Sequence, residues 1–264
     1  MLPLAADRLP PSAPDFDQAL RDGLKQIGVS ARKVTVDGAA YPSVETFQVD
    51  LTGAQFNRDV RIPKPGPAQD APLFQAKSLE IVARPLSFES LPLTVQISAQ
   101  DAVFACVPEE TVGSILTLRK AADGRVEIEI EKSALEAFLK TLAAQAASKQ
   151  GANVKEVHLH LDSRGPRSVA FTAEVQAKMF VMSAEVTLSG EASIDDDLNL
   201  HVSNLALGGN AMAANLLGKF AKPYFDQVQS KPISLAALSL GDVRLRDVTL
   251  QAGETLRLQA RFGG

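Results

Sequence analysis

The chain has 264 residues, 45% of them apolar and 22% charged, a composition typical of a globular protein that can bury a sizeable core. The net charge of −4 argues against a broad nucleic-acid-binding surface, and the lack of tryptophan argues against stacking platforms for bases or sugars. The single cysteine, Cys106, rules out an internal disulfide and is expected to lie buried among apolar neighbours.

The apolar segments of the chain are too short to predict a membrane span. None approaches the roughly 20 consecutive apolar residues that cross a bilayer. The first ten residues lack a basic segment followed by a continuous apolar one, so no signal peptide is expected in the chain as given. Two locations stay open: soluble or peripheral at the cytoplasmic face of a membrane, or periplasmic after removal of an export segment.

The first predicted helix follows a short polar stretch near the start of the chain. The spacing predicts a helix over Asp15–Ile27, with Asp15 as its N-cap and Gln18 three residues later. Its apolar stripe comprises Phe16, Leu20, Leu24 and Ile27.

Most of the remaining chain alternates apolar and polar residues with period two. This pattern is typical of antiparallel strands with one dry and one solvated face. Two polar segments, Ala121–Gly124 and Ser193–Asn199, are expected to be hairpin turns. The predicted strands include Phe47–Leu51, Leu93–Ile97, Val126–Ile130, Val157–Leu161, Phe171–Val175, Leu198–Val202, Val243–Leu250 and Leu256–Ala260.

The second predicted helix covers Ser133–Lys149. Ser133 and Glu136 have the spacing of a capping box, in which each side chain bonds the other residue's backbone N–H. The side chains expected to be buried are Leu135, Phe138, Leu139, Leu142 and Ala146.

A third apolar segment follows Gly208 and Gly209 and initially resembles a phosphate-binding loop. That motif requires a glycine five residues before Gly218 and a Ser or Thr after Lys219. The sequence has Ala213 and Phe220 at those positions, so a nucleotide site is not expected.

The same segment fits an amphipathic helix over Asn210–Gln229. The two preceding glycines supply a turn, and Pro223 is expected to kink the helix. Its polar stripe is Asn215, Lys219, Lys222, Asp226 and Gln229, and its apolar arc contains Met212, Leu216, Leu217, Phe220, Ala221, Phe225 and Val228.

Each predicted helix precedes a pair of strands, which suggests a repeated helix-plus-hairpin plan. We expect one elongated domain over residues 1–264, with 1–130 and 131–264 as its halves. Broad apolar helices against sheets with one dry face imply a long apolar seam. Large aromatic side chains to fill such a seam are scarce, so a tunnel for acyl chains is predicted.

No pattern of catalytic residues emerges. His158, His160 and His201 lack partners at metal-ligand spacing, and the Ser-x-x-Lys at Ser30–Lys33 has no accompanying Lys-Thr-Gly. We therefore expect neither an enzyme nor a cofactor, and no bound metal.

The last third of the chain resembles a known family. A strand pair leads through glycines to an amphipathic helix and then to a closing hairpin marked by Val243, Leu245, Val248, Leu250, Gly253, Leu256 and Leu258. This order is similar to the LmeA-like phospholipid-binding family, which is related by fold to tubular lipid-binding proteins such as the bactericidal permeability-increasing type. The resemblance implies an α+β fold in which a strongly curved antiparallel sheet wraps around long amphipathic helices and holds lipid tails.

The resulting hypothesis is a non-enzymatic protein that binds or transfers phospholipid or another acyl-chain lipid and contacts membrane surfaces transiently. The predicted tail contacts are Leu135, Phe138, Leu139, Leu142, Met212, Leu216, Leu217, Phe220 and Phe225, and the predicted head-group contacts are Arg32, Lys33, Lys219 and Lys222. The alternative is a structural or assembly module with a fully packed core, which binds protein partners through its sheet faces.

Overall fold

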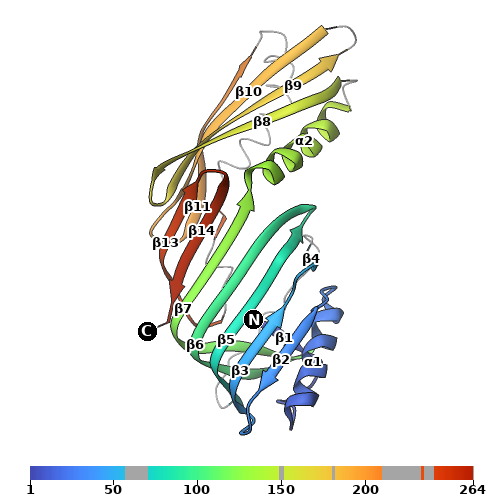
Figure 1. Cartoon of the computed structure of the whole chain (residues 1–264), viewed down its shortest axis with the longest axis vertical. Helices are drawn as coiled ribbons and strands as arrows, with labels where there is room; N and C mark the ends of the chain where they lie inside the picture. The colour runs from blue at the N-terminus through green and yellow to red at the C-terminus, as the bar shows by residue number, and fades with distance from the viewer. Residues whose placement is uncertain (57–70, 149–151, 180–181, 210–232, 235–240, 264) are drawn as a thin grey trace. The chain divides into compact units, whose positions relative to one another are not determined.

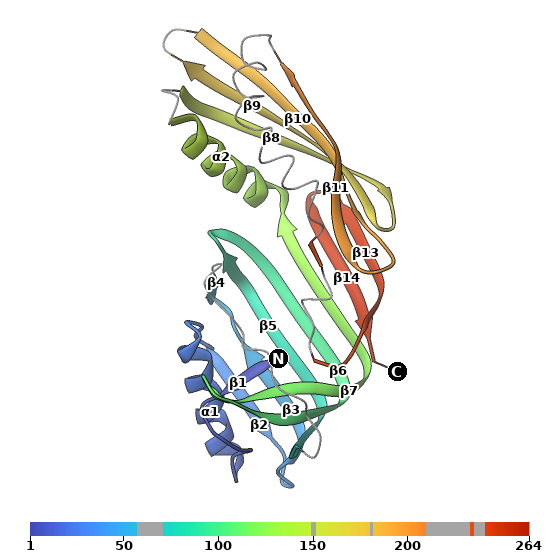
Figure 2. The same ribbon diagram turned by 180° about the vertical axis from the view of Figure 1, so that it is seen from behind.

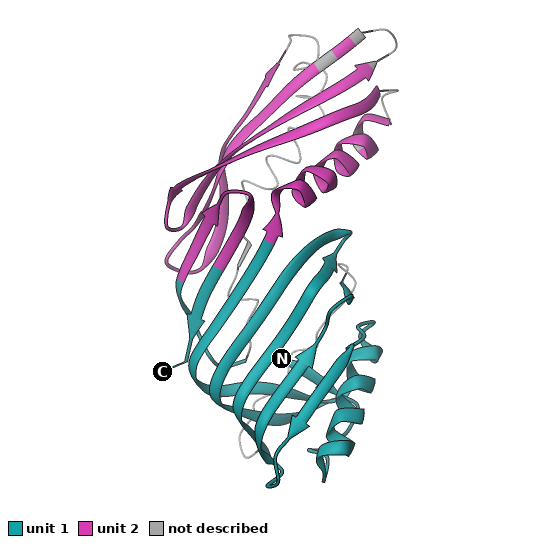
Figure 3. Ribbon diagram, in the orientation of Figure 1, with its two compact units in different colours: residues 1–129, 238–247, 259–264 teal, residues 130–237, 248–258 magenta. Residues whose placement is uncertain are grey.

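The computed structural model describes residues 1–56, 71–148, 152–179, 182–209, 233–234 and 241–263. In this part of the chain most residues lie in strands and two helices are present, which is an α+β architecture (Figure 1). The chain divides into two compact units (Figure 3). Unit 1 contains residues 1–129, 238–247 and 259–264, and unit 2 contains residues 130–237 and 248–258.

The first sheet has the strand order β13-β14-β7-β6-β5-β3-β2, with β1 paired to β7 and β4 paired to β5. The pairing of β5 with β3 and β4 is parallel, whereas β2–β3, β5–β6, β6–β7 and β1–β7 are antiparallel. Its strands are β1 (Leu2–Leu4), β2 (Lys33–Asp37), β3 (Ser43–Asp50), β4 (Gln55–Phe56), β5 (Leu73–Phe88), β6 (Leu91–Glu109), β7 (Gly113–Glu131), β13 (Leu245–Ala252) and β14 (Thr255–Phe262).

Helix α1 (Ala13–Gln26) begins earlier than the sequence predicts. Its N-cap is Ser12, whose Oγ accepts a hydrogen bond from the backbone N–H of Asp15 at 3.3 Å. The expected cap at Asp15 is therefore wrong. A proline within the first two helical positions explains the earlier start, because its fixed φ suits the first turn and its missing N–H costs no helical bond there.

The core of unit 1 is built around an aromatic cluster beneath α1. Phe16 stacks on Phe74 with ring centroids 4.5 Å apart and meets Phe47 edge-on at 5.6 Å. Phe104 lies against Phe47 and Phe74, and all four rings are at most 4% exposed. Bulky aromatic side chains therefore fill this part of the interior, in contrast to the scarcity expected from the sequence.

One predicted turn in unit 1 is wrong. Ala121–Gly124 lies within β7, which continues to Glu131. The pairing with β6 is irregular at this point, and Asp123 has φ +46°. The glycine serves close packing, because a Cβ at Gly124 would overlap the ring of Phe262.

The second sheet has the order β12-β11-β10-β9-β8, and all its pairings are antiparallel. The hairpin of β8 and β9 follows helix α2 (Lys132–Ser148), as the repeated helix-plus-hairpin plan predicts. Figure 2 shows α2 running beside this sheet. The strands are β8 (Ala152–Gly165), β9 (Ser168–Met179), β10 (Met182–Ile194), β11 (Asn199–Gly209) and β12 (Ile233–Ser234).

The start of α2 differs from the predicted capping box. The helix begins at Lys132, directly after β7, so Ser133 lies inside the first turn instead of capping it. The backbone N–H of Lys132 donates to the carbonyl of Glu254 at 3.0 Å. Glu136 is directed to β8, where its Oε1 accepts the backbone N–H of Leu159 at 2.8 Å. The direct junction between strand and helix leaves no loop in which the reciprocal cap could form.

Candidate functional site

The second sheet has one apolar and one polar face, as the alternation predicts. Strand register places Leu159, Ala173, Leu188 and Leu207 in one row across four strands. The neighbouring positions along each strand carry polar residues that face the other way, such as His160, and these are mostly more exposed. The sheet therefore presents a continuous apolar surface within unit 2.

Helix α2 covers one part of this apolar face. Ala147 of α2 is buried with Val154 and Val157 of β8 in a small hydrophobic cluster. Leu139 and Ala143 of α2 pack against the same cluster, one helical turn apart from each other. Small alanine side chains on this face allow the helix to approach the sheet closely.

The apolar face continues beyond this cluster as side chains that are only partly buried. They come from all four long strands and share the face that α2 packs on. These residues, together called the open apolar face, are Leu161, Phe171, Leu188, Leu200, Val202 and Leu207.

The predicted tail contacts on α2 differ in their exposure to solvent. Leu135, Phe138 and Leu139 are partly buried, and Leu139 packs against the cluster on the sheet. Leu142 is 46% exposed, so its predicted burial is wrong. The reason is that the packed face runs through Leu139 and Ala143, which places Leu142 on the flank of the helix.

The other predicted contacts belong to unit 1 or lie outside the described residues. Arg32 and Lys33 are exposed residues of unit 1. Their charges add to the hydrogen bonds from Thr52, the main cause that lowers the pKa of Asp50. The remaining predicted contacts, which are Met212, Leu216, Leu217, Lys219, Phe220, Lys222 and Phe225, lie outside the described residues, as does most of the predicted helix Asn210–Gln229, and stay predictions.

A polar cavity of about 340 Å³ lies in unit 2 and was not expected from the sequence. Its walls come from the start of α2, the β8–β9 hairpin and the turn between β13 and β14, which are distant in sequence. The only sequence signal is the alternation of polar residues in β8. Six of the lining residues are Lys132, His160, Leu161, Arg164, Phe171 and Glu254.

Some of the charged side chains that line this cavity form an ion pair and others do not. Arg164 and Asp162 form an ion pair with an N–O distance of 3.5 Å. The ammonium of Lys132 and the carboxylate of Glu254 make no ion pair with any described residue. Within the described part of the chain, the cavity thus carries one cation and one anion that form no ion pair.

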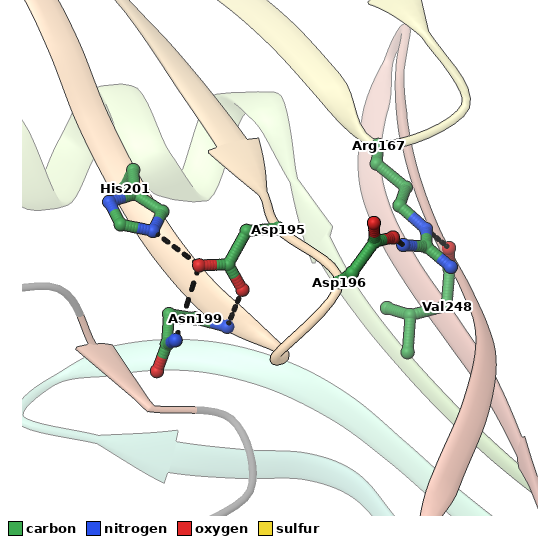
Figure 4. A network of polar contacts seen from close by, with 6 residues as sticks. All are labelled: Arg167, Asp195, Asp196, Asn199, His201 and Val248. Atoms are coloured by element: carbon green, nitrogen blue, oxygen red, sulfur yellow. Dashed lines mark hydrogen bonds and ion pairs between the residues drawn. The ribbon is translucent and has the colours of Figure 1, made fainter.

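A second polar group closes the predicted turn between β10 and β11 (Figure 4). Asp195 accepts the backbone N–H of Asn199 at 2.7 Å and lies 2.7 Å from His201 Nε2. These bonds, led by the one from the Asn199 backbone, lower the pKa of Asp195 to about 2. Next to it, Arg167 binds Asp196 at 2.9 Å and the carbonyl of Val248 at 3.0 Å. The group stabilises a turn and confirms its prediction.

Cys106 is 1% exposed, and burial raises the pKa of its thiol, as expected for a small apolar core residue. No three His, Cys, Asp or Glu side chains are grouped as metal ligands in the described ranges. Among the described residues, no helix is both long and apolar enough to cross a membrane. Comparisons with protein-family models, curated proteins and solved structures find no match to this chain.

Proposed function

We propose that the protein binds an acyl chain of a phospholipid or related lipid on the open apolar face of unit 2, without catalysing a reaction. The observation that carries this proposal is the partly buried surface of aliphatic and phenylalanine side chains beyond the α2 cluster. Contiguous apolar surface that stays accessible to solvent commonly marks a ligand or partner site. Helix α2 adds apolar side chains in the same unit, namely the exposed Leu142 and the partly buried Leu135 and Phe138.

An acyl chain suits this surface chemically. The side chains of this surface present methyl and methylene groups, and such groups require no hydrogen bonds from the ligand. Burying one methylene contributes about 0.8 kcal/mol, so eight methylenes supply several kcal/mol before the costs of association. Affinity should therefore increase with chain length.

We also propose the enclosing architecture that the family resemblance implies. In that arrangement a curved sheet and amphipathic helices enclose lipid tails, and transient contact with a membrane surface lets the protein load and release them. The two helices and the long antiparallel strands of the described residues are compatible with this arrangement.

The alternative function, a structural or assembly module, has one observation in its favour. The aromatic cluster under α1 fills the interior of unit 1 with the chain's own side chains. That part of the molecule therefore has a packed core of the kind that an assembly module needs. The lipid proposal is accordingly limited to unit 2.

Lipid extraction tests the proposal directly. The purified protein is extracted with organic solvent and analysed by mass spectrometry, and uptake of fluorescent phospholipid from vesicles is measured in parallel. We expect co-purified phospholipid or saturable uptake. An empty extract together with no uptake would contradict lipid binding and favour the assembly module.

A further inference from the structure

The polar cavity adjoins the open apolar face. Leu161 and Phe171 are register partners on that face, and both also line the cavity. His160 and Thr172, their neighbours in β8 and β9, line it as well. A molecule whose apolar part lies on the open apolar face would therefore have its polar end within reach of this cavity.

The charges in the cavity favour a particular polar end. Lys132 and Glu254 are joined through their backbones at 3.0 Å, yet their side-chain charges are not paired with each other. A cation and an anion held separately in one cavity complement a ligand that carries both charges.

A purely anionic ligand fits less well. A ligand with a phosphate but no ammonium would bring its negative charge near two acidic lining residues, Asp162 and Glu254, without a cation of its own to offset them. The guanidinium of Arg164 is already paired with Asp162, which reduces its attraction for a phosphate. The cavity is lined by two basic residues, Lys132 and Arg164, and by two acidic residues, Asp162 and Glu254, so their formal charges balance.

We propose that the cavity binds a zwitterionic phosphoester of the phosphoethanolamine class, as the head group of the lipid whose chain lies on the open apolar face. The phosphate would meet Lys132, and the ammonium would meet Glu254. This inference rests on the proposed function for its lipid part, whereas the cavity itself can be tested with the free head group.

Calorimetric titration with short-chain lipids below their micelle concentration tests the proposal. The probes are dihexanoyl phosphatidylethanolamine, dihexanoyl phosphatidylglycerol and free phosphoethanolamine. We expect the first to bind about tenfold more tightly than the second, since one charged contact is worth at least about one decade in affinity. Free phosphoethanolamine should bind more weakly than the lipid that carries it.

Variants that each remove one charge test which residue contacts the head group. Lys132→Gln and Glu254→Gln should each weaken binding of the phosphatidylethanolamine about tenfold, and Glu254→Gln should also reduce the preference over phosphatidylglycerol. Lys155→Gln and Glu185→Gln are matched controls, because both residues are exposed in unit 2 and do not line the cavity. Circular dichroism establishes that each variant is folded.

The outcomes separate the two proposals. Lipid binding without head-group preference, unaffected by Lys132→Gln and Glu254→Gln, would overturn the head-group site and leave acyl-chain binding intact. Equal affinity for free phosphoethanolamine and its lipid, lost in both variants, would support the cavity and overturn the acyl-chain site. No binding of any probe would overturn both.

Discussion

The carboxylate of Glu136 in α2 accepts the backbone N–H of Leu159 in β8 at 2.8 Å. Strand β8 is at one end of the second sheet's strand order, so no strand of the described residues pairs with this N–H on that side. Exposed edge strands invite pairing with other chains, and natural proteins cover or charge them. Glu136 therefore both attaches α2 to the sheet and occupies a bonding position on its edge.

Replacing Glu136 by alanine should destabilise unit 2. The variant leaves the Leu159 N–H without its acceptor, and we expect a loss of about 1–2 kcal/mol in the free energy of unfolding. Urea denaturation measures this loss, and hydrogen exchange should show faster exchange at the Leu159 amide. Lys140→Ala, an exposed change on the same helix, is the control. Unchanged exchange at Leu159 would show that the bond is absent in solution.

The fluorescence of a tryptophan at position 142 should change when an acyl chain binds. The natural chain has no tryptophan, so Leu142→Trp introduces a single fluorophore on the exposed flank of α2. Lipid with brominated acyl chains is expected to quench its emission and shift it to shorter wavelength. Lys178→Trp, on the polar face of β9, is the matched control and should respond weakly. Equal quenching at both positions would indicate non-specific adsorption.

The low pKa of Asp195 predicts acid sensitivity of the turn between β10 and β11. The folded value is about 2 and the reference value is 3.8, so its ionised form is stabilised by folding. That stabilisation is present above pH 3.8 and is lost as the pH falls from about 4 toward 2.

Asp195→Asn removes this titration while keeping a side-chain oxygen for the Asn199 N–H. Urea midpoints measured from pH 5 to pH 2 should fall less steeply in the variant than in the natural chain. Groups that titrate in both proteins cancel in the comparison. Parallel pH profiles would mean that Asp195 does not titrate abnormally.

Patterns along the chain predict local structure well and the site poorly. Phe16, Leu20 and Leu24 form the buried stripe of α1 as their spacing predicts. The alternating segments fall in strands because a half-buried sheet imposes period two. In contrast, Leu142 was misplaced, because helical spacing defines an apolar arc but not which part of it the sheet covers.

The polar cavity could not be predicted for a topological reason. Lys132, His160 and Glu254 are brought together only because the turn between β13 and β14 bonds to the start of α2. No local spacing encodes that juxtaposition. Glu136 shows the same limit, since its capping-box pattern is satisfied in sequence while its carboxylate bonds a strand residue 23 positions away.

Gly124→Ala should destabilise unit 1, because the added methyl group would overlap the ring of Phe262, which is fully buried. Overpacking of this kind costs about 1–3 kcal/mol. Urea denaturation of the variant measures the loss, and Gly165→Ala is the control, since its Cβ would meet no atom within 4 Å. Combining Gly124→Ala with Phe262→Leu should cost less than the sum of the two single changes, because the smaller side chain relieves the overlap. Additive losses would show that the strand and the ring do not touch in solution.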